Sequence, residues 1–147
     1  MAERASTQRP KRPEFRNIDA FTDLPGYRLP LAGLVSILHR ASGAIMFLLM
    51  PFIIWMFDTS LSSELSFARF SSAFTAGVGF VPGVLVKVVV LGLIWAYLHH
   101  FFAGLRHIRM DMFHTVSKEA GFRSARRVLW LSLPLTVVFG AKLFGWY

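Results

Sequence analysis

The sequence predicts an all-α protein that crosses a membrane three times. Of its 147 residues, 54% are hydrophobic and 16% are charged, whereas a soluble domain usually carries about 25% charged residues. Three stretches are apolar over the roughly 20 residues that a helix needs to cross a bilayer. No stretch alternates apolar and polar residues as a half-buried strand would. Because the chain has no cysteine, disulfides and thiolate metal sites are excluded.

Residues 1–30 form a polar arm before the first apolar stretch. The arm contains six basic and four acidic residues, and no apolar segment follows the first basic ones as it would in a cleavable signal peptide. The acidic residues also argue against an organellar transit peptide. We therefore expect a bacterial protein with a cytoplasmic N-terminal arm over residues 1–30 and a three-helix transmembrane domain over residues 31–147.

Prolines mark the three expected spans differently. Pro82 suits the first turn of the second span, where its missing N–H is not needed. Pro51 and Pro134 are expected to kink the first and third spans, which membrane helices tolerate when neighbours satisfy the freed carbonyl groups. The expected bounds of the spans are residues 31–57, 80–105 and 128–147.

The connecting segments predict the orientation. Residues 106–127 carry six lysines or arginines, whereas residues 58–79 carry one. By the positive-inside rule the N-terminus is cytoplasmic and the C-terminus periplasmic, in a multi-pass protein of the bacterial cytoplasmic membrane. This topology accounts for the net charge of +8. The lipid bilayer is thus an expected partner, and a nucleic acid is not, because it would need a basic face on a soluble domain.

Lys87 and Lys142 lie near the outer ends of their spans, where they can reach the headgroups. Arg40 is different, because it lies about 14 Å along the first helix from its expected start. An arginine at a membrane centre costs roughly 2.5–3.5 kcal/mol and usually faces a partner or a ligand. A helix that starts nearer Val35 would instead let Arg40 reach the headgroups.

Ser36, His39 and Gly43 accompany Arg40 in the segment "SILHRASG". Ser36 shares a helix face with Arg40, four residues on, and His39 lies beside that face. A hydroxyl next to a guanidinium offers hydrogen-bond donors to a carbonyl or carboxylate group. Gly43 leaves room for a flat group or a neighbouring helix. The segment therefore indicates a polar binding site in the first span.

A second polar cluster ends the second span. His100, Gly104 and His107 form one helical stripe, and His99 points about 100° away. The seven-residue spacing separates the two striped histidines by about 10.5 Å along the axis, too far for one metal ion. One histidine from each of two helices can instead ligate a haem iron, although a membrane histidine can also simply hydrogen-bond a neighbouring helix. Both clusters lie at similar depth on antiparallel helices, which favours one shared site.

At these residues the chain resembles the larger cytochrome b membrane-anchor subunit of succinate dehydrogenase (complex II). The family segment Ser-x-x-His-Arg-x-(Ser/Thr)-Gly is matched by residues 36–43. The family segment His-x-x-x-Gly-x-Arg-His-x-x-x-Asp is matched by "HFFAGLRHIRMD", residues 100–111. The resemblance covers about residues 25–147, and the family's Ser-Pro-His-Leu continuation after Arg-Pro is absent.

The resemblance implies a haem b shared with a second, smaller anchor subunit. His100 would be the axial ligand of the haem iron, with His99 as its competitor in this chain. Ser36 and Arg40 would bind the quinone, ubiquinone or menaquinone, and His39, Arg40 and His107 would lie near the haem propionates. An iron–sulfur subunit and a flavoprotein subunit would be the other partners. The chain has no catalytic residue for succinate itself, and electrons from succinate would pass through the iron–sulfur clusters to quinone.

Three other functions remain open at this point. A fumarate reductase anchor would run the reaction in the reverse direction. A transport or channel module would line a polar path with Arg40 and His100. A purely structural three-helix protein would hold no cofactor.

Overall fold

The computed structural model describes residues 17, 19, 21–23, 26–115 and 117–147. Most of the arm expected over residues 1–30 therefore lies outside the described residues. The described part contains five helices and no extended strand; two residues, Val78 and Val81, pair in a single isolated bridge. The helices are α1 (Leu31–Leu48), α2 (Met50–Leu61), α3 (Glu64–Ala73), α4 (Gly83–Phe113) and α5 (Lys118–Phe144).

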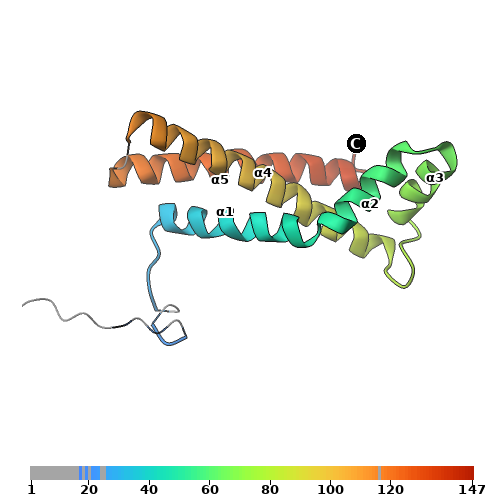
Figure 1. Cartoon of the computed structure of the whole chain (residues 1–147), viewed down its shortest axis with the longest axis horizontal. Helices are drawn as coiled ribbons and strands as arrows, with labels where there is room; N and C mark the ends of the chain where they lie inside the picture. Colours follow the sequence, from blue (N-terminus) through green and yellow to red (C-terminus); the bar gives the residue numbers. More distant parts are fainter. Residues whose placement is uncertain (1–16, 18, 20, 24–25, 116) are drawn as a thin grey trace, which may run out of the picture.

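Three of these helices, α1, α4 and α5, are long and apolar enough to cross a membrane. The prediction of an all-α membrane protein with three spans is thus confirmed. In Figure 1, α4 and α5 run side by side in opposite directions, and α1 packs against both. The start of α1, the end of α4 and the start of α5 meet at one end of the molecule. Helices α2 and α3 and the C-terminus lie at the other end.

The first apolar stretch is broken into two helices. Helix α1 ends at Leu48 and α2 begins at Met50, and Pro51 occupies the first turn of α2. The intervening Leu49 adopts φ −91° and ψ 7°, and its N–H still donates to the Ile45 carbonyl at 3.0 Å. Because a proline inside a helix clashes with the preceding turn, the bend expected at Pro51 takes the form of this break. Helix α5, by contrast, continues through Pro134.

Helical structure extends beyond the expected spans. The connection at residues 58–79 contains α3, which starts at a capping box in which Ser63 and Ser66 each bond the other's backbone N–H, at 3.1 and 2.8 Å. Helix α4 continues to Phe113, and α5 starts at Lys118 instead of near Val128. The basic connection expected over residues 106–127 is therefore mostly helical. Apolar composition marks only the part of a helix that lipid can surround, so it underestimates helix length.

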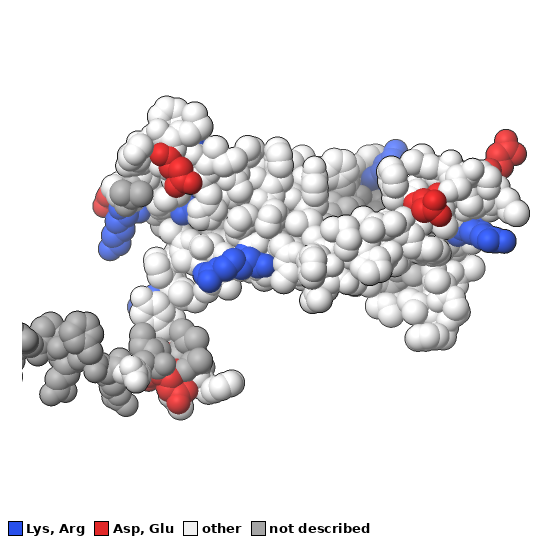
Figure 2. Space-filling view, viewed as in Figure 1, with Lys and Arg blue, Asp and Glu red and all other residues white. Residues whose placement is uncertain are grey.

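Small residues form the interface of the three long helices. Val35 of α1, Ala103 of α4, and Ala125 and Val128 of α5 make its buried core. Larger apolar side chains point outward, as in a helix bundle that faces lipid or partner chains. In Figure 2 the charged side chains gather near the two ends of the molecule, and one basic patch lies over α1. Arg40 is the single charged residue of α1.

Candidate functional site

His100 of α4 is held against the backbone of α1. Its Nδ1 lies 3.1 Å from the carbonyl oxygen of His39 and 3.4 Å from the Ser42 hydroxyl. A carbonyl oxygen only accepts hydrogen bonds, so in this contact Nδ1–H is the donor. In a neutral imidazole that arrangement leaves the lone pair on Nε2. The hydrogen bond thus orients the ring and fixes the tautomer that can bind a metal through Nε2.

Three histidine rings gather where α1 faces α4. The ring centroid of His39 lies 4.2 Å from that of His100 and 5.3 Å from that of His107. The Nε2 atom of His39 is buried and has no hydrogen-bond partner among the described residues. A buried polar atom without a partner is costly. Because the His39 side chain as a whole is only partly buried, this nitrogen is suited to a polar group supplied from outside the chain.

Glycines allow the close approach of the two helices at this point. A Cβ atom at Gly43 would lie 2.9 Å from Cε1 of His100, closer than real Cβ contacts. A Cβ atom at Gly104 would lie 3.8 Å from Nε2 of His39, an ordinary contact distance. The His100 ring can therefore lie against α1 only because Gly43 has no side chain.

The neighbouring His99 lies in a different environment. Its side chain is fully buried, with 0% of its surface exposed, and its ring stacks on Trp95 with centroids 5.5 Å apart. Both of its ring nitrogens are buried without a hydrogen-bond partner among the described residues. His100, in contrast, is only partly buried. A group outside the chain could reach His99 only if the helices repacked.

Ser36 and Arg40 lie together on α1, as predicted from their spacing. The Nε–H of Arg40 donates to the backbone carbonyl of Ser36 at 3.5 Å. Arg40 is exposed and Ser36 is half-buried, so the guanidinium lies on the outside of this chain with donors free to bind an acceptor. The structure thus brings the predicted quinone-site pair together on the outside of α1, and brings His39, His100 and His107 together between α1 and α4.

Ser42 is a site residue that reasoning from the sequence did not assign. Its side chain is fully buried, its hydroxyl donates to the His39 carbonyl at 2.8 Å, and the same hydroxyl lies close to His100 Nδ1. Its place in the matched segment "SILHRASG" was the available signal. Among the described residues, no three possible ligands converge to hold a metal ion by themselves.

Comparison with known proteins identifies similar chains. Residues 8–139 match the family described as succinate dehydrogenase/fumarate reductase transmembrane subunit. The succinate dehydrogenase cytochrome b556 subunit of Coxiella burnetii (strain RSA 493 / Nine Mile phase I) is 30% identical over 122 residues, which are 83% of this chain and 93% of that protein. The subunit of the same name from Paracoccus denitrificans is 29% identical over 112 residues, 76% of this chain and 81% of that protein.

Proposed function

Because the chain belongs to the succinate dehydrogenase/fumarate reductase transmembrane subunit family, we propose that it binds haem b and forms part of a quinone-reduction site. Its membership makes it a cytochrome b membrane anchor that works with partner subunits in a membrane. The proposal goes further, since it assigns residues to the haem and the quinone. The relatives' names favour succinate oxidation over fumarate reduction as the direction.

The observation that carries the haem assignment is the hydrogen bond from His100 Nδ1–H to the His39 carbonyl. It supports His100 as the residue that would hold the haem iron through Nε2, because a ligating histidine usually donates its other ring N–H to a neighbouring acceptor. The unpartnered Nε2 of His39 also supports a polar group bound beside it. When bound, the haem supplies an iron that accepts and donates one electron at a time.

The residues around His100 have separate roles in this proposal. His39, Arg40 and His107 would bind the haem propionates, because imidazole and guanidinium groups are donors for carboxylates. Gly43 leaves space for the His100 ring, and Ser42 holds the carbonyl that orients it. The second histidine for the iron would come from a smaller anchor subunit, as expected for the family to which the chain belongs.

We assign the quinone head group to Ser36 and Arg40. The guanidinium would donate to a quinone oxygen and stabilise the negative charge that develops there during reduction, while the Ser36 hydroxyl would orient the ring. A quinone becomes a quinol by taking up two electrons and two protons. Arg40 is exposed on this chain, which leaves space for ubiquinone or menaquinone and for the iron–sulfur subunit that would deliver the electrons.

The remaining assignments concern the assembly. The iron–sulfur and flavoprotein subunits would dock on the cytoplasmic side of a bacterial inner membrane, where the positive-inside rule places the N-terminus and the α4–α5 connection. This end of the molecule is also the one at which α1 starts. The subunit would hold the soluble subunits at the membrane, while the oxidation of succinate would take place in them.

A reduced-minus-oxidised absorbance spectrum of the purified complex tests the haem assignment. We expect His100→Leu to remove the b-type signal, and His99→Leu, its matched control, to keep it. Flavin content per complex measures assembly separately, so that a lost subunit is not mistaken for a lost haem. A full b-type signal in an assembled His100→Leu complex would show that the iron is bound elsewhere.

A further inference from the structure

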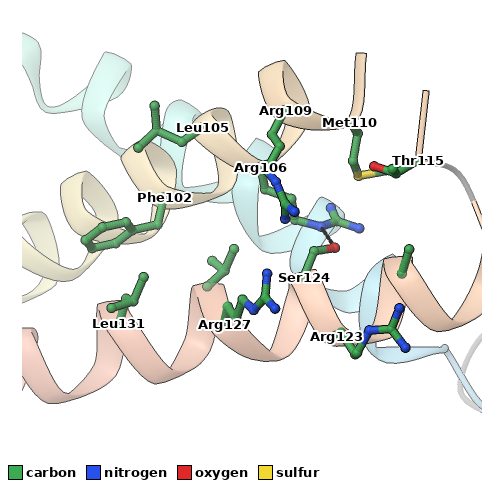
Figure 3. A pocket seen from close by; sticks show the side chains of 12 residues that line it. Phe102, Leu105, Arg106, Arg109, Met110, Thr115, Arg123, Ser124, Arg127 and Leu131 are labelled. Atoms are coloured by element: carbon green, nitrogen blue, oxygen red, sulfur yellow. Dashed lines mark hydrogen bonds between the residues drawn. The ribbon is translucent and has the colours of Figure 1, made fainter. Parts of the chain in front are cut away.

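A second polar site lies between the end of α4 and the start of α5. It is a pocket of about 420 Å³ that four arginines help to line, Arg106 and Arg109 from α4 and Arg123 and Arg127 from α5. Figure 3 shows the side chains of Arg106, Arg109 and Arg127 pointing into the space between the two helices. None of the described residues that line the pocket is acidic. The site therefore concentrates positive charge without a carboxylate in its wall.

This pocket is separate from the histidine site. On α4, positions 102, 106 and 109 run along the middle of the pocket wall, with positions 105 and 110 to either side, whereas the histidine site uses positions 100, 104 and 107. The two stripes are offset by two residues, and therefore by about 200° around the helix axis. One face of α4 carries imidazoles toward α1, and the opposite face carries guanidinium groups toward α5.

Arg106 is fixed within the pocket wall. Only 8% of its surface is exposed, and its Nε–H donates to the Ser124 hydroxyl at 3.0 Å. That hydroxyl in turn donates to the Gly121 carbonyl at 3.0 Å. A buried cation is costly unless an anion offsets it. The fixed guanidinium, with three further arginines at the same pocket, is thus prepared for an anionic group.

The other end of the pocket is apolar. Phe102 of α4 and Leu131 of α5 line it, and about seven residues, or about 10 Å along the axis, separate Phe102 from Arg109. Leu131 is about half exposed, so this end opens on the outside of the bundle. A free phosphate would use only the arginines. A molecule with a negatively charged head and a hydrocarbon tail would use both ends.

We propose that this pocket binds an anionic phospholipid, with its phosphate among the four arginines and an acyl chain along Phe102 and Leu131. The pocket lies where the apolar parts of two membrane helices give way to charged residues, so it would lie at the level of the lipid headgroups. Basic pockets between transmembrane helices bind anionic headgroups in this way. The lipid would hold the α4–α5 end in position at the membrane surface.

Native mass spectrometry of the detergent-purified, delipidated complex tests the proposal. The complex is titrated with dioleoylphosphatidylglycerol and, separately, with dioleoylphosphatidylcholine. We expect one phosphatidylglycerol site to weaken by at least about tenfold in the double variant Arg109→Gln, Arg127→Gln, because each basic residue contributes appreciably to the binding of anionic lipid. The control is Arg126→Gln, which removes one positive charge from an exposed neighbour outside the pocket and matches the single variant Arg109→Gln in charge. It should bind like the unchanged protein.

Four results would overturn the proposal. The first two are that the double variant binds phosphatidylglycerol as tightly as the unchanged complex, and that the unchanged complex binds phosphatidylcholine as tightly as phosphatidylglycerol. The third is that millimolar inorganic phosphate displaces the lipid. The fourth is that the double variant loses a protein subunit but still binds the lipid. The last would assign the pocket to an acidic segment of a partner. If the double variant does not assemble, lipid binding is measured instead in the single variant Arg109→Gln and, at several salt concentrations, in the unchanged complex. Binding that does not change with salt would contradict an anionic headgroup. The haem spectrum should be the same in all variants, so failure of the haem assignment remains distinguishable.

Discussion

Gly43→Ala isolates the contact between α1 and the His100 ring. The added Cβ would lie 2.9 Å from Cε1 and 3.2 Å from Nδ1 of His100. Carbon atoms in ordinary contact lie about 3.5–4.0 Å apart, so the ring must withdraw by at least about 0.6 Å. The His39 carbonyl lies on the same helix, one turn before Gly43. A His100 ring that moves away from α1 at Gly43 therefore also moves away from this carbonyl. The hydrogen bond, now 3.1 Å long, would be lost.

Loss of this bond should weaken haem binding. Removal of a hydrogen bond that orients a metal ligand typically costs about 10–100-fold in affinity. We therefore expect the Gly43→Ala complex to contain less haem per flavin than the unchanged complex, and to lose it faster to a haem-binding acceptor such as apomyoglobin. Pyridine haemochromogen absorbance and flavin fluorescence measure the two cofactors independently.

Gly92→Ala provides a matched control. It also places a methyl group on a membrane helix, but there it meets nothing within 4 Å. This variant should retain haem, and it should stabilise the helix slightly, because alanine favours a helix by about 1 kcal/mol over glycine. A Gly43→Ala complex that binds haem as tightly as Gly92→Ala would refute the reasoning.

Two further predictions concern polar side chains of α1 and α5. Arg40→Leu should lower quinone reduction by at least about tenfold, because it removes the donor that stabilises charge on the quinone oxygen, while reduction of an artificial dye by the soluble subunits stays unchanged. Equal loss of both activities would indicate an assembly defect and contradict the assigned role. The Ser132 hydroxyl is fully buried and has no hydrogen-bond partner among the described residues. Ser132→Ala should therefore leave the thermal unfolding temperature of the complex unchanged or raise it, and a marked fall would reveal a bond that the described residues do not show.

Much of the site could be predicted from local sequence. The spacing of Ser36 and Arg40 places them on one face of any helix, and the structure has them in contact through the Ser36 carbonyl. The stripe of His100, Gly104 and His107 follows in the same way from 3.6 residues per turn. Periodicity is a property of one helix, so it survives whatever the helix packs against.

Other features of the site depended on the neighbouring helix. The sequence left His99 and His100 as competitors, and only the packing of α1 on α4 decided that His99 is fully buried while His100 meets the His39 carbonyl. The role of Ser42 and the arginine pocket between α4 and α5 were also missed. In each case side chains from two different helices meet, Ser42 with His100 and the arginines of α4 with those of α5. Spacing along the sequence does not determine the distance between residues on different helices.

The sequence by itself determined that the chain enters a membrane on three apolar helices and that its polar residues gather in two clusters. Hydropathy and helical period are set residue by residue, because they follow from the transfer of each side chain out of water and from backbone geometry. The tertiary structure alone decided how far α4 and α5 extend, and which face of α4 meets α1 and which meets α5. Those outcomes depend on close packing between segments that are distant in the sequence. At Gly43, for example, the absence of a Cβ atom lets the His100 ring lie against α1.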